Sequence, residues 1–291
     1  KVTKLRTRNH KVVLNRSAGG DVGISIFLVL FGLFMFIPMY YAIIQSLKPL
    51  DELWMYPPRF YVANPTFQNF ADMFKAMTDS WVPFSRYIFN PVFISVGGTF
   101  GNLVCGSLAA YAVSKIKFPG RAGLQKMVRL ALMFHATVGS VVNFMTMSAL
   151  HLIDTYWAII IPACGSTLGM FLMMQFMESS VPDTVLESAR LDGASEIRTY
   201  WTIAMPMVKP AWLTLIVYSF QGLWQTGSSI YIMSEQYKTF NYAISQIVSS
   251  GIARAGVGMA SAVVMMIVPV AVFVITQSNI IETMSTSGMK D

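Results

Sequence analysis

Long apolar stretches without acidic residues constrain this chain more than any other feature. Six of them are long enough to cross a bilayer, at residues 24–47, 89–114, 123–147, 156–177, 211–233 and 257–281. None contains Asp or Glu, and basic residues occur only near the start of the third, as Lys126 and Arg129. The chain is 54% hydrophobic and only 12% charged, which is far from the composition of soluble domains. Because helices satisfy their own backbone hydrogen bonds in lipid, the pattern predicts an all-α membrane protein with six transmembrane helices.

Basic residues predict how these helices are oriented. Fifteen of the 21 Lys and Arg residues fall in the N-terminal segment, the second-to-third connection, the fourth-to-fifth connection and the C-terminal tail. Since cytoplasmic connections carry the excess of Lys and Arg, we expect both termini on the cytoplasmic side of a cell membrane. The expected organisation is a basic segment at 1–22, a six-span domain at 23–281 and a cytoplasmic tail at 282–291. The net charge of +7 then reflects topology, and we expect no nucleic-acid partner.

Several chemical classes find no support in the sequence. Cys105 and Cys164 both lie within apolar stretches, so we expect packing residues and no disulfide framework. His10, His135 and His151 are too dispersed to predict a metal site. The chain also lacks a G-x-x-x-x-G-K-[ST] phosphate loop, a nucleophile elbow and an H-E-x-x-H motif. We therefore expect neither a catalytic subunit nor a bound cofactor.

The fourth and fifth apolar stretches are separated by a polar insert that reads as two helices joined by a sharp turn. We call residues 180–206 the hairpin. Ser180 is a candidate N-cap with Pro182 in the first turn, and Gly193 is suited to end the first helix because glycine accepts left-handed backbone angles. Ser195 is a candidate cap for a second short helix, which we expect to run toward Trp201 and to end before Pro206. From these features alone, an amphipathic surface loop and a docking element for a soluble partner are both open.

The residues of the hairpin resemble the EAA motif of the permease subunits of bacterial ABC importers. That motif reads E-A-A, three residues, G, nine residues, I, one residue, L-P, and Glu187, Ala189, Gly193, Ile203 and Pro206 match it in spacing. Ser188 takes the second position and Met205 takes the place of the leucine. The resemblance implies that the hairpin is a coupling helix that inserts into an ATPase subunit. Its candidate ATPase-coupling residues are Glu187, Ser188, Ala189, Asp192, Gly193, Ala194, Ile203 and Pro206.

Further segments resemble the sugar permeases within that family. They are residues 109–112 with 118–121, the turn at 152–156, Trp224, and residues 237–243, the last resembling an oligosaccharide or polysaccharide subgroup. The usual Asn after the tryptophan is replaced by Gln225, and the acidic and aromatic residues that follow are replaced by Thr226 and Gly227. The resemblance covers nearly the whole chain from residue 24 and implies the type I importer permease fold of the maltose-transporter type. The implied partners are a second related permease, two ATPase subunits that hold ATP and Mg, an external solute-binding protein and membrane lipid.

The C-terminal tail and the long external loop each have two possible roles. Gly288 and Lys290 resemble the tail that reaches between the two ATPase subunits in this family, whereas the alternative is a frayed terminus. The loop at about 48–87 is rich in aromatic residues, and we expect a short helix near 69–77. This loop is either an aromatic belt at the membrane surface or a platform for the binding protein, and both roles are compatible.

Polar residues within the apolar stretches are candidates for lining a path for solute. The candidate substrate-path residues are Tyr218, Gln221, Trp224, Gln225, Ser228, Asn143 and Asn102. Amides beside aromatic rings and without charges suit a neutral, hydroxyl-rich solute such as a sugar. The alternative is ordinary hydrogen bonding between helices.

The prediction is therefore a non-catalytic permease subunit of an ATP-driven sugar importer in a bacterial cell membrane. An importer of the same class for another solute, such as a peptide, stays open. A secondary transporter is less favoured, because it would need an intramembrane ion site and inverted internal symmetry, and the sequence displays neither.

Overall fold

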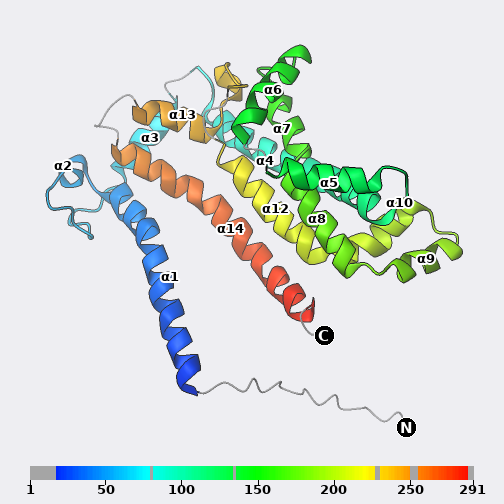
Figure 1. The fold of residues 1–291 in the computed structure, drawn as a ribbon. Coiled ribbons are helices and arrows are strands. Elements are labelled where there is room, and N and C mark those ends of the chain that lie inside the picture. The colour runs from blue at the N-terminus through cyan, green and yellow to red at the C-terminus, as the bar shows by residue number, and fades with distance from the viewer. Residues whose placement is uncertain (1–17, 79–80, 134–135, 227–229, 250–254, 288–291) are drawn as a thin grey trace, which may run out of the picture.

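The computed structural model describes residues 18–78, 81–133, 136–226, 230–249 and 255–287, and these residues form helices and connecting loops without a β-strand (Figure 1). The N-terminal half contains α1 (Ala18–Leu47), α2 (Leu50–Leu53), α3 (Gln68–Thr78), α4 (Phe84–Lys115), α5 (Arg121–Ala131) and α6 (Ala136–Ala149). The C-terminal half contains α7 (Trp157–Cys164), α8 (Thr167–Ser180), α9 (Asp183–Leu191), α10 (Glu196–Thr199), the π-helical turn η1 (Tyr200–Ala204), α11 (Met205–Met207), α12 (Lys209–Trp224), the 3-10 turn η2 (Glu235–Tyr237), α13 (Phe240–Ser249) and α14 (Ala255–Ser287). The all-α prediction is confirmed for the described residues.

Four helical segments of the described chain are long and apolar enough to cross a membrane. They are Gly19–Leu47, Phe84–Lys115, Trp157–Ser180 and Ala255–Gln277. A fifth is possible if Glu196–Met207 and Lys209–Trp224, which meet at an angle of 83°, are counted as one broken span. The third predicted stretch forms the two shorter helices α5 and α6, and residues 134 and 135 between them lie outside the described residues. The count of six spans and the cytoplasmic placement of both termini stay predictions.

The fifth predicted stretch is shorter than the sequence indicates. Its helix, α12, ends at Trp224 instead of continuing to Met233, so this boundary is wrong. Tertiary hydrogen bonds keep residues 231–234 out of a helix. Met233 N and Ser234 N donate to Asp154 Oδ1 at 2.9 and 2.8 Å, and Asp154 N donates to Tyr231 O at 2.7 Å. Bonds to the distant carboxylate replace the helical bonds that hydropathy alone would favour.

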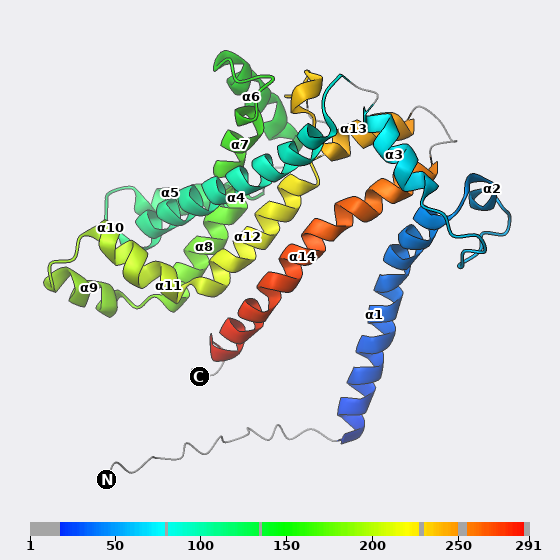
Figure 2. The ribbon, with the colours of Figure 1, turned by 180° about the vertical axis from the view of Figure 1, so that it is seen from behind.

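Helix α4, which has 32 residues, packs against α7, α8 and α12 (Figures 1 and 2). Small residues make this packing close. A Cβ atom on Gly101 would lie 2.3 Å from Cys164 Sγ, and one on Gly98 would lie 2.5 Å from Leu223 Cδ1. Gly97 also lies close to Ile160 of α7 and Gly169 lies close to Asn102 of α4, so α4 is the shared partner of these contacts.

One end of the bundle carries α3, α13 and the loop 230–239, and we call it the loop end. Asn90 of α4 is fully buried there, and its Nδ2 donates to Gln236 O at 3.0 Å and to Lys238 O at 2.7 Å. Its Oδ1 accepts a hydrogen bond from Tyr156 Oη at 2.8 Å. Helix α3 was predicted near 69–77 and is present, and its buried Asn69 donates to Ser46 O and Lys48 O at the end of α1. These buried amides donate hydrogen bonds to backbone carbonyls that would otherwise be buried without a partner.

Helix α1 leaves most of its surface uncovered. Its most apolar window is entirely unburied within the chain, and the helices that it packs against most are α14 and α3. Both ribbon views show α1 converging on α14 near the loop end and diverging from it toward the other end (Figures 1 and 2). An apolar surface of this kind requires lipid or another membrane subunit around it.

A methyl group added at Gly169 tests how tightly α4 and α8 are packed. The new Cβ would lie 2.6 Å from Asn102 Oδ1 and 3.0 Å from Leu215 Cδ1. We expect Gly169→Ala to lower the free energy of unfolding by about 1–3 kcal/mol through overpacking. Gly139→Ala is the control, because a Cβ there has no neighbour within 4 Å and α6 gains helix propensity. Thermal unfolding in detergent micelles measures both, and equal midpoints for the two variants would contradict the close packing.

Candidate functional site

The first helix of the hairpin begins two residues later than its sequence suggests. Helix α8 continues to Ser180, so Ser180 is not the N-cap of the next helix. Val181 and Pro182 are extended, Pro182 occupies the N-cap position, and α9 starts at Asp183. The apolar packing of Val181, which is 1% exposed, explains the shift, because it draws the chain inward before the new helix can start.

Gly193 ends α9 as predicted. Its φ is +77°, a left-handed conformation that side chains with a Cβ rarely adopt. Gly193 N donates to Arg190 O and Ala194 N donates to Ala189 O, both at 3.0 Å. These two bonds form a Schellman motif, which satisfies the last carbonyls of the helix and reverses the chain.

The second arm of the hairpin starts as predicted and ends differently. The Ser195 side chain accepts a hydrogen bond from Arg198 N, which makes it the N-cap of α10. The arm then continues through the π-helical turn η1 and through Pro206 in α11, so the prediction that it ends before Pro206 is wrong. Proline is tolerated there because Pro206 is one of the first residues of α11, where its missing N–H is not needed.

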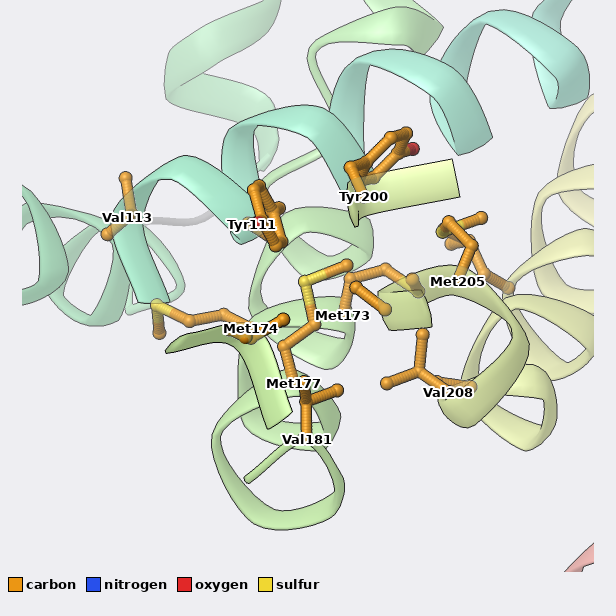
Figure 3. Close-up of a cluster of buried hydrophobic side chains, with 14 residues drawn as sticks. Tyr111, Val113, Met173, Met174, Met177, Val181, Tyr200, Met205 and Val208 are labelled. Atoms are coloured by element: carbon orange, nitrogen blue, oxygen red, sulfur yellow. The ribbon is translucent and has the colours of Figure 1, made fainter. Parts of the chain in front are cut away.

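An apolar core fixes the base of the hairpin. Met173, Met174 and Met177 of α8 are all fully buried, and Leu186 and Tyr200 of the hairpin are 1% exposed. Figure 3 shows side chains of this core from α4, α8 and the hairpin converging on one another. The hairpin is therefore a packed extension of the helical bundle.

The candidate coupling residues divide into an outer and an inner set. Glu187, Ser188, Asp192, Gly193 and Pro206 are exposed, whereas Ala189 is buried and Ala194 and Ile203 are partly buried. Thus the structure places the residues of the motif along one hairpin, but only the first set faces outward. Ala189 and Ile203 instead pack toward the core, where they shape the hairpin from within.

Two outward apolar side chains were missed by sequence reasoning. Leu191 is 89% exposed and Ile197 is 70% exposed, one on each arm of the hairpin. Leu186 points inward, so the helical period of 3.6 residues would have placed Leu191 on the outer face. Large apolar residues exposed on a rigid polar element indicate a contact with another protein.

An ion pair ties the start of α9 to the end of α4. Lys115 Nζ lies 2.8 Å from Asp183 Oδ1 and donates to Val181 O at 2.7 Å, and its side chain is only 5% exposed. The hydrogen bond and the charge of Lys115 lower the pKa of Asp183 below its ordinary value. Asp183 also lies at the N-terminus of α9, where a negative charge is favourable.

A second set of bonds joins the other arm of the hairpin to α4. Arg190 Nε donates to Glu196 Oε1 at 2.7 Å, and Tyr111 Oη donates to Glu196 Oε2 at 2.9 Å. The Tyr111 ring packs edge to face with Tyr200 at 5.5 Å between centroids, and the Tyr200 hydroxyl is hydrogen-bonded to Ser107 at 2.6 Å. Sequence reasoning missed Tyr111 and Lys115, because neither belongs to the motif.

The candidate substrate-path residues do not form one cluster. Tyr218 is 56% exposed and Gln221 is partly buried on the same side of α12, while Asn143 is exposed on α6. Asn102 is buried and bonds Ser219 Oγ, so its amide joins α4 to α12. Ser228 lies outside the described residues, as do Gly288 and Lys290 of the tail.

Trp224 and Gln225 line a cavity of 240 Å³ between α12, α13 and α14. Trp224 is 4% exposed and its Nε1 donates to Met265 O at 3.0 Å, so the indole is held in the helix packing. Asn241 of α13 lines the same cavity and donates to Gln225 O at 3.1 Å, and it was not among the predicted residues. The described residues contain no group of three His, Cys, Asp or Glu side chains that could hold a metal ion.

The arrangement of long apolar helices and a rigid polar hairpin is that of a transporter's membrane subunit, and sequence comparison defines the family. Residues 21–285 match the family described as "Binding-protein-dependent transport system inner membrane component". The chain belongs to this family of ABC importer permeases, which are membrane subunits without catalytic activity of their own.

Curated relatives have similar sequences over most of their length. The sn-glycerol-3-phosphate transport system permease protein UgpE of Yersinia enterocolitica is 27% identical over 73% of this chain and 75% of its own. The polygalacturonan/rhamnogalacturonan transport system permease protein YtcP of Bacillus subtilis is 27% identical over 71% of this chain and 69% of its own. Protein LplC of Bacillus subtilis is 30% identical over 70% of this chain and 66% of its own.

A solved structure has the same fold. A chain of a bacterial ABC transporter involved in the import of the acidic polysaccharide alginate aligns with a TM-score of 0.75 at 22% sequence identity. The alignment covers 90% of this chain and 98% of the other. The importer permease fold expected from the motif is thus the fold of this chain.

The Lys115–Asp183 pair predicts a pH-dependent stability. Since the folded pKa of Asp183 is lowered, its contribution is present above the ordinary aspartate pKa and is lost as the pH falls through the folded value. We expect wild type to melt at a higher temperature than Asp183→Asn at about pH 7, and the difference to vanish below about pH 3. The effect should be small, because the carboxylate is 71% exposed.

Asp192→Asn is the control for this measurement. Asp192 is exposed on the same hairpin and has no ion pair among the described residues. Asp192→Asn removes a carboxylate of the hairpin without removing an ion pair, so the comparison separates the contact with Lys115 from the loss of a charge. A difference for Asp183→Asn that is the same at both pH values would show that the ion pair does not contribute.

Proposed function

We propose that this chain is the transmembrane permease subunit of an ATP-driven, binding-protein-dependent importer of carbohydrates, in which the hairpin couples it to an ATPase. The observation that carries the proposal is the hairpin itself. It is anchored by a buried core and presents Glu187, Leu191 and Ile197 outward. A hairpin that binds a partner protein has to be rigid if it is to transmit the partner's movement.

The remaining partners follow from the same function. The uncovered surface of α1 suits contact with a second, related permease. Two ATPase subunits would bind ATP and Mg. We propose that the hairpin, the tail with Gly288 and Lys290, and both termini face the cytoplasm, on the strength of the asymmetry in Lys and Arg. The loop end would then face the external binding protein. The six-span domain at 23–281 would form half of the translocation path.

ATP binding would shift the equilibrium between two arrangements of this subunit. The ATPase pair closes, the hairpin moves with its cleft, and the helices exchange an inward-open for an outward-open arrangement. The residues proposed to contact the ATPase are those of the outer set together with Leu191 and Ile197. Ala189, Ala194 and Ile203 would keep the hairpin in shape.

A carbohydrate is the proposed solute. On α12, Tyr218 and Gln221 present a phenol and an amide beside each other on an open surface, and Gln225 follows at the end of the helix. No Lys, Arg, Asp or Glu occurs between residues 210 and 234. Uncharged amides and aromatic rings match hydroxyl groups and sugar ring faces, and the name of YtcP points to polysaccharide import.

A second candidate solute is a small organic phosphate. The name of UgpE, which describes an sn-glycerol-3-phosphate system, favours it. Recognition of a phosphate normally uses Arg, Lys or helix N-termini, and the second permease would have to provide these groups. Uptake assays with a neutral oligosaccharide, an oligogalacturonide and glycerol 3-phosphate separate the candidates.

Reversing the charge on the hairpin tests the coupling. In the complex reconstituted with its ATPase, partner permease and binding protein, we expect Glu187→Arg to lower uptake and binding-protein-stimulated ATP hydrolysis at least about tenfold, which is about 1.4 kcal/mol of coupling. Glu178→Arg is the control, since Glu178 is exposed on α8 and outside the hairpin. Uptake that continues in the absence of any ATPase would instead establish a secondary transporter.

Replacing the amide on α12 tests the solute path. We expect Gln221→Leu to reduce uptake of the preferred solute about tenfold, because a polar group that bonds the solute is lost, while hydrolysis without binding protein is unchanged. Phe100→Leu, at a position that is 68% exposed on α4, is the control. If Gln221→Leu transports the solute at the wild-type rate, Gln221 does not line the path.

A further inference from the structure

The hairpin is covalently joined to α8 and α12, and polar side chains of α4 bind both of its arms. Lys115 of α4 binds Asp183 and Val181 O at the start of α9. Tyr111 of α4, one helical turn earlier, binds Glu196 at the start of α10. The two contacts therefore hold both arms of the hairpin to one turn of a single helix.

The contact through Tyr111 is specific in geometry. Arg190 from α9 donates to both oxygens of Glu196, at 2.7 and 3.4 Å, and Tyr111 donates to the second of them, so this carboxylate also fixes the two arms to each other. Tyr111 is 3% exposed, and its ring is wedged against Tyr200, which is 1% exposed and bonded to Ser107 of α4. A buried tyrosine with a satisfied hydroxyl has few alternative positions.

The same helix reaches the other end of the molecule. Its 32 residues span about 48 Å at 1.5 Å per residue. Near its first turns, Tyr87 Oη donates to Glu235 Oε1 at 2.8 Å and Asn90 holds the carbonyls of Gln236 and Lys238. Between the two ends, the close contacts at Gly98 and Gly101 leave little room for α4 to slide past its neighbours.

We propose that Tyr111 and Lys115 are positioning residues that fix the hairpin to α4, so that the movement of the ATPase is delivered to α4 and, through it, to the loop end. This inference rests on the proposed function, since it names the element to which the coupling is delivered. Neither residue touches ATP or solute. Both act by keeping the hairpin and α4 as one rigid unit.

Removal of single groups in the reconstituted complex tests the role of Tyr111. Tyr111→Phe keeps the ring and loses only the hydroxyl bond to Glu196, whereas Glu196→Gln weakens the bonds to both Tyr111 and Arg190. We expect each to lower the ratio of binding-protein-stimulated to basal ATP hydrolysis about fivefold or more, with unchanged subunit assembly and melting temperature. The variant with both changes should lose no more than Glu196→Gln alone, because the two residues form one contact.

Two results would overturn the role of Tyr111. One is a stimulated-to-basal ratio in Tyr111→Phe equal to that of Tyr61→Phe, a control in the external loop where the tyrosine is 58% exposed. The other is a fall in assembly and melting temperature that accounts for the whole loss of activity, which would mark a merely structural residue.

A distance measurement tests the rigid unit without reference to the solute. Spin labels at Thr184→Cys on α9 and Val96→Cys on α4, both at exposed positions, are introduced after Cys105 and Cys164 are replaced by alanine. We expect one narrow distance distribution that is the same in the nucleotide-free and ATP-bound complexes. With Tyr111→Phe and Lys115→Met together, the distribution should broaden.

An unchanged distribution in that double variant would overturn the inference. If wild type instead transports none of the tested solutes while the labels behave as expected, the proposed function fails and the attachment of the hairpin to α4 stands.

Discussion

Close packing around α4 is the constraint on which the rest of this structure depends. Glycines at positions 97, 98, 101 and 106 bring α4 so near to α7, α8 and α12 that added methyl groups would collide at Gly98 and Gly101. In a membrane, helices gain little from excluding water, so contact area and interhelical hydrogen bonds have to hold them together. The helix that permits the closest approach thus becomes the axis of the bundle, and both the hairpin and the loop end are attached to it.

The hairpin is a polar segment whose orientation is set by the helices around it. Its backbone turn is set locally by Gly193, but its orientation comes from the methionines of α8 and from Tyr111 and Lys115 of α4. Methionine fills irregular space well, and here it seats two short helices that would be unstable alone. The outward residues can then meet a partner without ordering themselves first, which lowers the cost of binding.

Polar residues within apolar stretches have more than one use in this chain. Asn90 donates hydrogen bonds to loop carbonyls, and Asn102 donates to the hydroxyl of Ser219 on α12. Trp224 donates to a carbonyl of α14. Tyr218, Gln221 and Asn143 instead present polar groups at surfaces that the chain itself does not cover. A polar side chain in a membrane helix needs a partner, but its sequence context does not say whether that partner is a helix, a second subunit or a solute.

The sequence alone determined the helical class, the existence of the hairpin, its turn at Gly193 and its cap at Ser195. These features depend on hydropathy and on local backbone chemistry, which act over a few residues. The tertiary structure decided where α12 stops, that Ser180 belongs to α8, that the hairpin continues past Pro206, and which residues of the motif face outward. It also brought Tyr111 and Lys115 to the hairpin across 66 residues or more of chain. Contacts of that kind arise only when distant segments pack together, so no local pattern in the sequence could have indicated them.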